Sequence, residues 1–436
     1  MESLRELRAF RNRAYSLLGN GRDGLFDLMD TVMTSRCLPS FAEVSLSPVF
    51  QRQWPSVYKS LSRAKPMGEK LMGLYLEHLP QPEQPILAGD HTAWPRLWSP
   101  TLKERTYEHQ PQHNPGSSPV TLGQGYSSLV CVPENEGSWA LPLLHERISS
   151  FESPLEKGAQ QLRRVCEAIN TRPLSLWDAE YGCARFVQLT ADIPCDKLMR
   201  LRSNRVLFGA PPAYGGRGRP RKHGAKFKLS EPATWGSSSQ QINLEHERLG
   251  SLRVQCWSGL HFRKTPDIAM TLIQVQHLTS SGLPTRRRPL WLIWTGAGKL
   301  DLHTIWQHYL RRFCVDHWYR FIKQRLHWCL PHLSTAQQAE VWSDLMPLMS
   351  WQLWLARHQA QHHHLPWQKP LNQPTPGRVA DAFATFLVAI GTPATVPKPR
   401  GKSPGWPPGK PRSQRQRFPT VKKRYSKPKV KTKAAA

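Results

Sequence analysis

The first 80 residues place their apolar side chains at the spacing of helices. Apolar positions recur at three- or four-residue intervals within 4–10, 25–29 and 57–75, which gives a helix one apolar face. Pro39, Pro48 and Pro55 interrupt the pattern, because proline removes a backbone donor and ends helices. A helical N-terminal domain is therefore predicted over residues 1–80.

From residue 85 onward the pattern changes to short apolar runs bounded by polar or turn residues, as in buried strands. Such runs lie at 86–89, 120–132, 139–144, 174–178 and 197–208, and a helical stretch at 154–170 precedes the fourth. Further strand-like runs follow at 252–262, 268–277 and 290–294. The alternation predicts an α/β domain over residues 81–330, followed by a second helical region at 331–390.

The last 46 residues, 391–436, have no periodicity and are rich in proline. They hold 14 Lys and Arg and no acid, a composition that cannot form a core and predicts a disordered tail. The whole chain has 60 Lys and Arg against 31 Asp and Glu, a net charge of +29. This excess predicts a polyanionic partner, most simply nucleic acid.

The eight cysteines show neither a C-x-x-C pair nor a repeated spacing, which argues against a zinc ribbon or a disulfide framework. The N-terminus lacks the apolar core of a signal peptide. No apolar run reaches the ~20 residues of a membrane-spanning helix. A soluble protein of the reducing cytosol, with no membrane partner, is expected.

Four residues near position 315 carry the clearest chemical pattern: Tyr309, Arg312, Asp316 and Lys323. The surrounding stretch TIWQHYLRRFCVDHWYRFIKQRLHW predicts one long helix. At about 100° per residue the last three fall at roughly 300°, 340° and 320° from the first, so all four share one stripe. An acid flanked by basic side chains suits a metal-dependent phosphodiester site, although mixed charge is also common on a solvated helix face.

Two further acids follow apolar runs. Asp90 comes after the run that ends at Gly89, and Asp178 follows Leu174–Trp177. Acids at the ends of buried strands can present metal ligands from a rigid sheet. A single acid in such a place is more often a helix cap or turn residue, but three together favour a metal site.

These motifs resemble the DDE transposases of bacterial insertion sequences. The resemblance covers roughly residues 80–400 and includes GDHT, WDAEYG, GRGRPRKHG and RRFCVDHWYRFIKQRLHW. It implies an RNase H-like mixed sheet flanked by helices, with a β-rich insertion at about 209–298 before the last catalytic helix. It also implies that Asp90, Asp178 and Asp316 are catalytic metal ligands supported by Tyr309, Arg312 and Lys323. The family usually has Glu as its third acid, and this chain has the shorter Asp316.

The resemblance further implies two Mg²⁺ (or Mn²⁺) ions, nicking of element ends, and joining of the 3′-hydroxyl to target DNA. The partners would be terminal inverted repeats and target DNA, with a homo-oligomer assembled on them in the bacterial cytoplasm, at the nucleoid. The helical N-terminal domain would bind the element ends, or else serve as a cap or dimerisation element. Two alternatives stay open: a non-catalytic DNA-binding protein derived from a transposase, and an RNase H-like structure-specific nuclease.

Two basic segments are candidate DNA contacts. Arg217-Gly218-Arg219-Pro220 matches an AT-hook, whose arginines enter a narrow minor groove, but a flexible loop that contacts phosphates fits as well. The residues expected to contact DNA are Arg217, Arg219, Arg221, Lys222, Lys422, Lys423 and Arg424.

Overall fold

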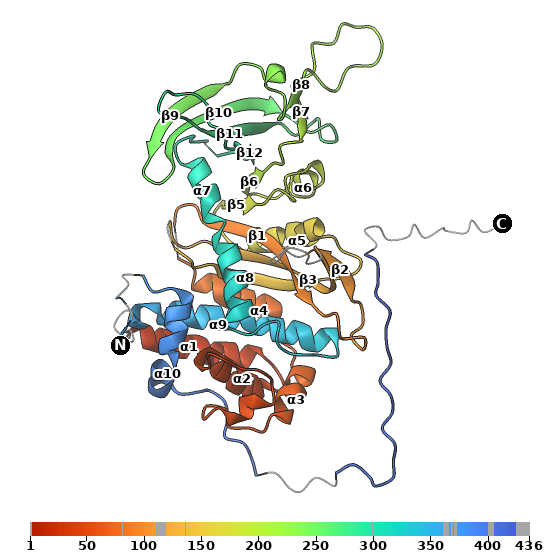
Figure 1. Ribbon diagram of the computed structural model, residues 1–436, viewed down its shortest axis with the longest axis vertical. Helices are drawn as coiled ribbons and strands as arrows, with labels where there is room; N and C mark the ends of the chain where they lie inside the picture. Colours follow the sequence, from red (N-terminus) through yellow and green to blue (C-terminus); the bar gives the residue numbers. More distant parts are fainter. Residues whose placement is uncertain are drawn as a thin grey trace, which may run out of the picture.

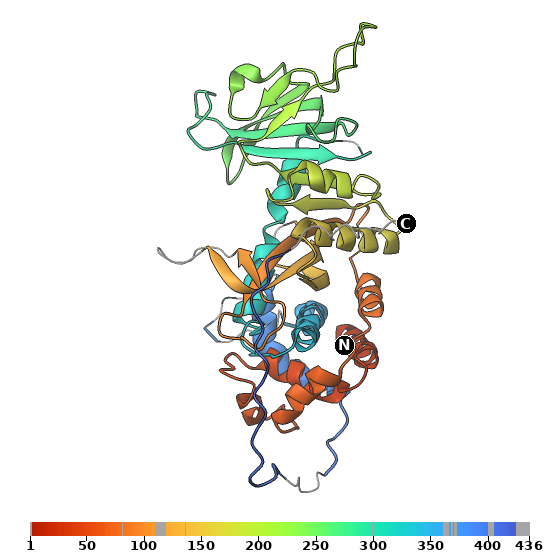
Figure 2. The same ribbon diagram turned by 90° about the vertical axis from the view of Figure 1, so that its right-hand side faces the viewer.

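The computed structural model of the chain describes residues 2–80, 82–109, 119–135, 137–298, 300–360, 366–367, 369, 373–399 and 405–423. The molecule is elongated, with a helical module at one end, a large sheet in the middle and a β-rich extension at the other end (Figures 1 and 2). No helix among these residues is both long enough and apolar enough to span a membrane.

Helices from both ends of the chain form the helical module. They are α1 (Glu2–Leu17), α2 (Arg22–Thr34), the short helix η1 (Glu43–Leu46), α3 (Pro55–Arg63), α4 (Gly68–Glu77), α9 (Ala336–Ala360) and α10 (Pro376–Ile390). The buried Arg11 guanidinium pairs with Asp30 at 2.8 Å and also bonds the Gln352 side chain. The N-terminal region and residues 331–390, expected as separate parts, therefore pack as one unit, with α1 and α3 against α9 and α2 against α10.

The central sheet has the mixed architecture that the sequence predicts. Its first strands are β1 (Ile86–Pro95), β2 (Thr106–His109), β3 (Val120–Cys131), β4 (Leu141–Ile148), β5 (Leu174–Trp177) and β6 (Asp196–Arg200). Parallel pairing joins β1 to β5 and β5 to β6, whereas β3 runs antiparallel to β1, β2 and β4. Helix α5 (Pro154–Ala168) connects β4 to β5, and the short α6 (Ala184–Leu189) precedes β6. This order is consistent with an RNase H-like fold.

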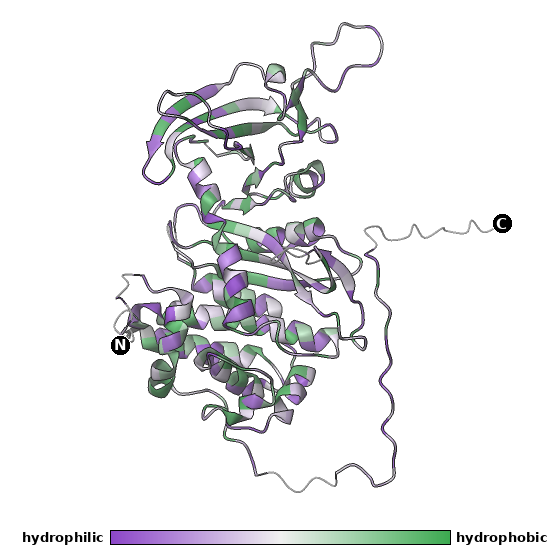
Figure 3. Cartoon of the chain, in the orientation of Figure 1, coloured by the Kyte–Doolittle hydropathy of each residue, from purple (hydrophilic) through white to green (hydrophobic). Residues whose placement is uncertain are grey.

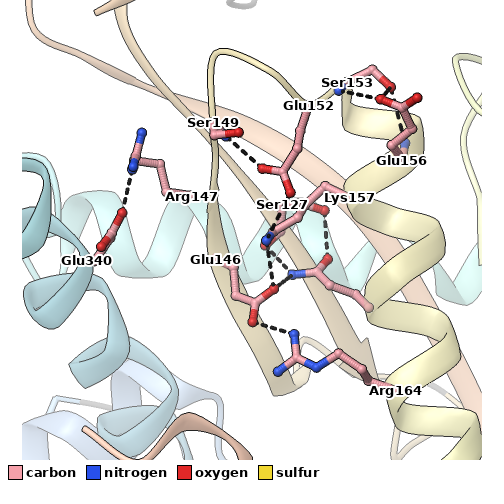
Figure 4. A network of polar contacts seen from close by, with 11 residues as sticks. Ser127, Glu146, Arg147, Ser149, Glu152, Ser153, Glu156, Lys157, Arg164 and Glu340 are labelled. Carbon is pink, nitrogen blue, oxygen red and sulfur yellow. Dashed lines mark hydrogen bonds and ion pairs between the residues drawn. The ribbon is translucent and has the colours of Figure 1, made fainter. Parts of the chain in front are cut away.

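Helices cover both faces of the sheet, and alternation along the strands decides which residues face which helix. On β4, Glu146 faces α5, where it bonds Gln161, Lys157 and Arg164 (Figure 4). The next residue, Arg147, points to the opposite face and bonds Glu340 on α9 at 2.6 Å. Figure 3 shows hydrophobic and hydrophilic segments alternating along the helices and strands of these layers. These polar contacts fix α5 and α9 against opposite sides of the same strand.

The β-rich extension continues the central sheet. Strand β12 (Leu290–Thr295) pairs antiparallel with β6, and β11 (Met270–His277), β10 (Gly250–Leu260) and β9 (Gln240–His246) follow in that order. Within the described residues this makes one ten-stranded sheet. The residues expected as a single run at 197–208 form two strands, since β7 (Val206–Phe208) leaves the sheet to pair with β8 (Lys226–Lys228). The short helix η2 (Pro232–Thr234) follows β8.

Part of the C-terminal tail, which the sequence predicts to be disordered, contacts the edge of the central sheet. Backbone N–H groups of Phe418 and Val421 donate to the carbonyls of Pro100 and Arg105 at 2.8 and 2.7 Å. The Lys423 ammonium lies 2.7 Å from Glu108 on β2. The composition of the tail could not predict this docking, because the docking depends on a few long-range polar contacts. Figure 1 shows the dark blue segment that begins at residue 405 running along the side of the molecule.

Candidate active site

Strand register brings Asp90 and Asp178 together. The parallel pairing of β1 with β5 ends at Gly89 and Trp177, so Asp90 and Asp178 are the next residues on two adjacent segments of the chain. Asp90 is not at the end of β1, as the sequence indicated, because β1 continues to Pro95 through its antiparallel pairing with β3. Gly89 is required here, since a Cβ at this position would lie 2.1 Å from the Trp177 ring.

The third acid lies on α8 (Cys314–Gln324), which crosses the sheet beside β1 (Figure 1). The long helix predicted around Asp316 is interrupted: α7 (Ile305–Arg311) ends and α8 begins on either side of Arg312 and Phe313. The N–H groups of these two residues bond carbonyls three positions back, at 3.1 and 3.3 Å, as in a 3₁₀ turn. The single-stripe geometry of an unbroken helix therefore does not apply across this turn.

Arg312 connects two of the three acids. Its guanidinium lies 3.0 Å from the Asp90 carboxylate and 3.2 Å from that of Asp316. Burial alone would lower the pKa of Arg312, but the attraction of Asp90, Asp316 and Asp178 raises it above its ordinary value. One buried cation thus interacts electrostatically with all three acids predicted from the sequence.

The Asp90 carboxylate is poorly neutralised despite this partner. Burial, opposed by Arg312 and reinforced by the negative charge of Asp178, raises the pKa of Asp90 to about 6. Desolvation and like charge both disfavour an ionised carboxylate. A site that gathers acids at such a cost is typical of cation binding or catalysis.

The other two predicted signature residues lie near the same acids. Lys323 donates to the Thr92 hydroxyl at 2.6 Å, two residues beyond Asp90, and burial lowers its pKa. Tyr309 is buried, which raises its pKa, and it interacts with Arg312 and Asp178. The structure therefore places all six predicted site residues in one region.

Four further residues belong to this region and were not singled out from the sequence. The Tyr319 hydroxyl donates to the Asp90 carbonyl at 2.9 Å and so fixes α8 on β1. His91 lies 3.3 Å from the Tyr181 hydroxyl and 3.7 Å from the Glu180 carboxylate. Their only sequence signal is proximity to Asp90, Asp178 and Asp316 within the motifs already noted.

Behind Asp90 the sheet is supported by a buried polar and aromatic cluster. Ser128, the cross-strand partner of Asp90, bonds the His145 ring at 2.8 Å. His145 packs edge-on against Trp318 and Trp328. Burial, with a smaller contribution from Lys323, lowers the pKa of His145 to about 3. This histidine is thus neutral and supports the strand from a dry interior.

The acids fit a divalent cation by their chemistry. Three carboxylates are the oxygen donors that Mg²⁺ and Mn²⁺ prefer. Among the described residues, no three His, Cys, Asp or Glu side chains are grouped closely enough to hold a metal ion. Arg312 instead bonds Asp90 and Asp316. All three acids could therefore share a cation only after this guanidinium releases one of the two carboxylates.

The predicted DNA contacts fall into three groups. Arg217, Arg219, Arg221 and Lys222 are exposed on the loop between β7 and β8, which projects from the extension in Figure 1. Lys422 is also exposed, but the Lys423 side chain is only 7% exposed and is paired with Glu108. Its charge is therefore paired within the protein. Arg424 lies outside the described residues.

A comparison with known protein families found a match. Residues 56–261 match the family described as DDE superfamily endonuclease. This match supports a DDE-type, transposase-like domain in this part of the chain. The matched stretch includes Asp90 and Asp178 but ends before the helix that carries Asp316. No curated protein matches the chain.

Proposed function

We propose that this protein is a DNA transposase that nicks the ends of an insertion sequence and joins the freed 3′-hydroxyl to target DNA. The observation that carries the proposal is that Arg312 bonds Asp90 on β1 and Asp316 on α8 and is also attracted by Asp178, which follows the adjacent parallel strand β5. A DDE endonuclease domain has DNA as its substrate, and the net charge of +29 suits that partner.

In this proposal Asp90, Asp178 and Asp316 hold two Mg²⁺ or Mn²⁺ ions. When bound, such ions supply an activated water or 3′-hydroxyl and stabilise the departing oxygen of an in-line displacement. The protein contributes position and charge: Tyr319 fixes the helix on β1, and Lys323 and Arg312 are available to phosphate oxygens. Arg312 would exchange a carboxylate for the DNA phosphate as the cations bind.

The basic loop at 217–222 is proposed to contact DNA beyond the site. Joining two element ends in one event requires at least two copies of the chain on the DNA. Asp316 instead of Glu shortens the reach of the third ligand by one methylene. Because Asp316 is 38% exposed and is bonded to Arg312, a small movement of this pair could supply the missing reach.

The test is incubation with supercoiled plasmid carrying the element ends, with Mg²⁺, with Mn²⁺ or with EDTA. We expect metal-dependent nicking and, with pre-cut ends, strand-transfer products. Binding without nicking would favour the non-catalytic DNA-binding protein, for which the neutralising position of Arg312 is the supporting observation. Nicking of hybrids or junctions without strand transfer would favour a structure-specific nuclease.

A further inference from the structure

The edge of the central sheet holds an enclosed ion pair, separate from the acids described above. At its centre is Glu108 on β2, whose side chain is only 5% exposed. Thr106 donates to this carboxylate. Gly125 on β3 leaves room for it, since a Cβ there would lie 2.8 Å from the carboxylate oxygen. A nearly enclosed carboxylate needs a cationic partner, because an unpaired buried charge is costly.

The chain supplies that partner itself. Lys423, 315 residues away in sequence, places its ammonium 2.7 Å and 2.9 Å from the two Glu108 oxygens. The backbone of Phe418 and Val421 bonds Pro100 and Arg105, and the Arg105 guanidinium reaches the Phe418 carbonyl at 3.5 Å. Backbone bonds at two positions and one enclosed ion pair together define residues 418–423 as a docked segment.

The residues just before the docked segment have the opposite character. All described residues from 405 to 417 are exposed, and the stretch 410–417 contains four basic residues and no acid. The Trp406 indole bonds the Lys410 carbonyl, and Arg412 lies 5.8 Å from its ring centre. This basic stretch is therefore accessible, partly ordered and held next to the catalytic domain by the docked segment.

We propose that residues 418–423 are an intramolecular anchor, and that the anchor holds the basic stretch 410–417 beside the catalytic sheet as a DNA-backbone contact. This rests on DNA being the substrate of the proposed function. Lys423 is a positioning residue in this arrangement and does not contact DNA. The anchor raises the local concentration of the basic stretch near bound DNA, as tethering does for any linked binding element.

The test compares two neighbouring lysines that differ in burial. Lys423→Glu removes the anchor, whereas Lys422→Glu makes the same charge change at an exposed position. Without DNA, trypsin cleavage after Arg417 should accelerate at least tenfold in Lys423→Glu and change little in Lys422→Glu. Equal rates in the two variants would overturn the anchor, whether or not the protein cleaves DNA.

Salt dependence of DNA binding provides the second measurement. Each phosphate contact contributes about 0.9 to the slope of log affinity against log salt. Lys422→Glu should change the slope by about one contact, and Lys423→Glu by about three to four, because the four basic residues of 410–417 lose their position. Lys423→Glu could lose its trypsin protection and still have the same salt slope as Lys422→Glu. The anchor would then not serve DNA binding, and that part of the proposal would be overturned. Failure of the wild type to bind DNA would count against the proposed function and leave the protection result valid.

Exchanging the two charges of the Glu108–Lys423 pair controls for misfolding and shows whether the two residues pair within one chain. Glu108→Lys combined with Lys423→Glu should restore protection within one chain, and Glu108→Gln should lose protection without reversing a buried charge. A mixture of Glu108→Lys chains with Lys423→Glu chains can form complementary pairs only between copies. Protection that stays lost in the mixture supports the intramolecular anchor, and protection regained on mixing would overturn it.

Discussion

Asp90 and Glu108 stand on the same sheet, and each is paired with a basic side chain from a distant part of the chain. The Asp90–Arg312 pair spans 222 residues at 3.0 Å, and the Glu108–Lys423 pair spans 315 residues at 2.7 Å. Asp90 lies among other acids, and its cation is shared with Asp316. Glu108 is enclosed with one cation, a threonine and a glycine. The same kind of contact therefore lies in a cluster of unbalanced charges in one region and in an enclosed ion pair in the other.

The largest expected effect comes from removing the negative charge of Asp90 in the Asp90–Arg312 pair. Asp90→Asn should reduce plasmid nicking by about a thousandfold or more, since a lost metal ligand removes several kcal/mol of transition-state stabilisation. DNA affinity should stay within about threefold, and stability should change by less than about 1 kcal/mol because the repulsion from Asp178 is also relieved. Nicking assays, gel shifts and denaturant unfolding measure the three quantities. Nicking that survives the substitution would remove Asp90 from the site.

Asp316 offers two graded changes at the same pair. Asp316→Asn should reduce cleavage and strand transfer by about a hundredfold or more, with DNA binding retained. Asp316→Glu should keep activity within about tenfold, because the side chain is 38% exposed and has room for one more methylene. A collapse in Asp316→Glu would mean that the sheet-to-helix distance has adapted to aspartate. Unchanged cleavage in Asp316→Asn would place the third ligand elsewhere.

Truncation of the C-terminal tail removes the Glu108–Lys423 ion pair and the basic stretch 410–417 together. The cut belongs after Thr395, because Gly391 and Thr395 still bond Arg11, Arg52 and Asp23 in the helical module. Deleting 396–436 should lower DNA affinity about tenfold to a hundredfold at physiological salt and flatten its salt dependence. Metal-dependent cleavage at saturating protein should persist. A truncated protein that binds normally but cannot cut would give the tail a catalytic role.

The smallest expected effect measures how dry the sheet is behind Asp90. His145 has an ordinary pKa near 6.5 when unfolded and about 3 when folded. The unfolded state therefore binds the extra proton first, and stability is lost as the pH falls below about 6.5, by up to about 1.4 kcal/mol per pH unit. His145→Gln should reduce that slope, whereas the exposed His303→Gln should not. The free energy of unfolding is measured with denaturant between pH 7 and 5. The same pH dependence in the wild type and in His145→Gln would contradict a buried neutral His145.

Several elements were predictable because each carries an apolar run. The cores of β1, β3, β4, β5, β10, β11 and β12 and the helix α5 coincide with runs read from the sequence. Strands β2 and β9 were missed, since TYEH and QQINLEH alternate polar residues with few apolar ones. Edge strands of this kind gain little from burial, so periodicity does not mark them.

The candidate site was predictable in its residues but not in its connections. Acids after apolar runs and a basic residue near an acid can be recognised locally. The break at Arg312 and Phe313 could not, because both keep helical backbone angles and neither is Pro or Gly. The Lys423–Glu108 contact could not be predicted either, since nothing in the sequence around a lysine of a basic tail indicates its partner.

The helical module sets an order for folding during synthesis. Arg11 needs Gln352, 341 positions later, and the faces of α1 and α2 pack against α9 and α10. At roughly 5–20 residues per second, these N-terminal helices would wait about 15–70 s for their partners. In that interval their apolar faces are uncovered while the catalytic sheet is being made. The chain should therefore depend on chaperones, and truncation within α9 should leave the N-terminal helices prone to aggregation even though the catalytic strands precede the cut.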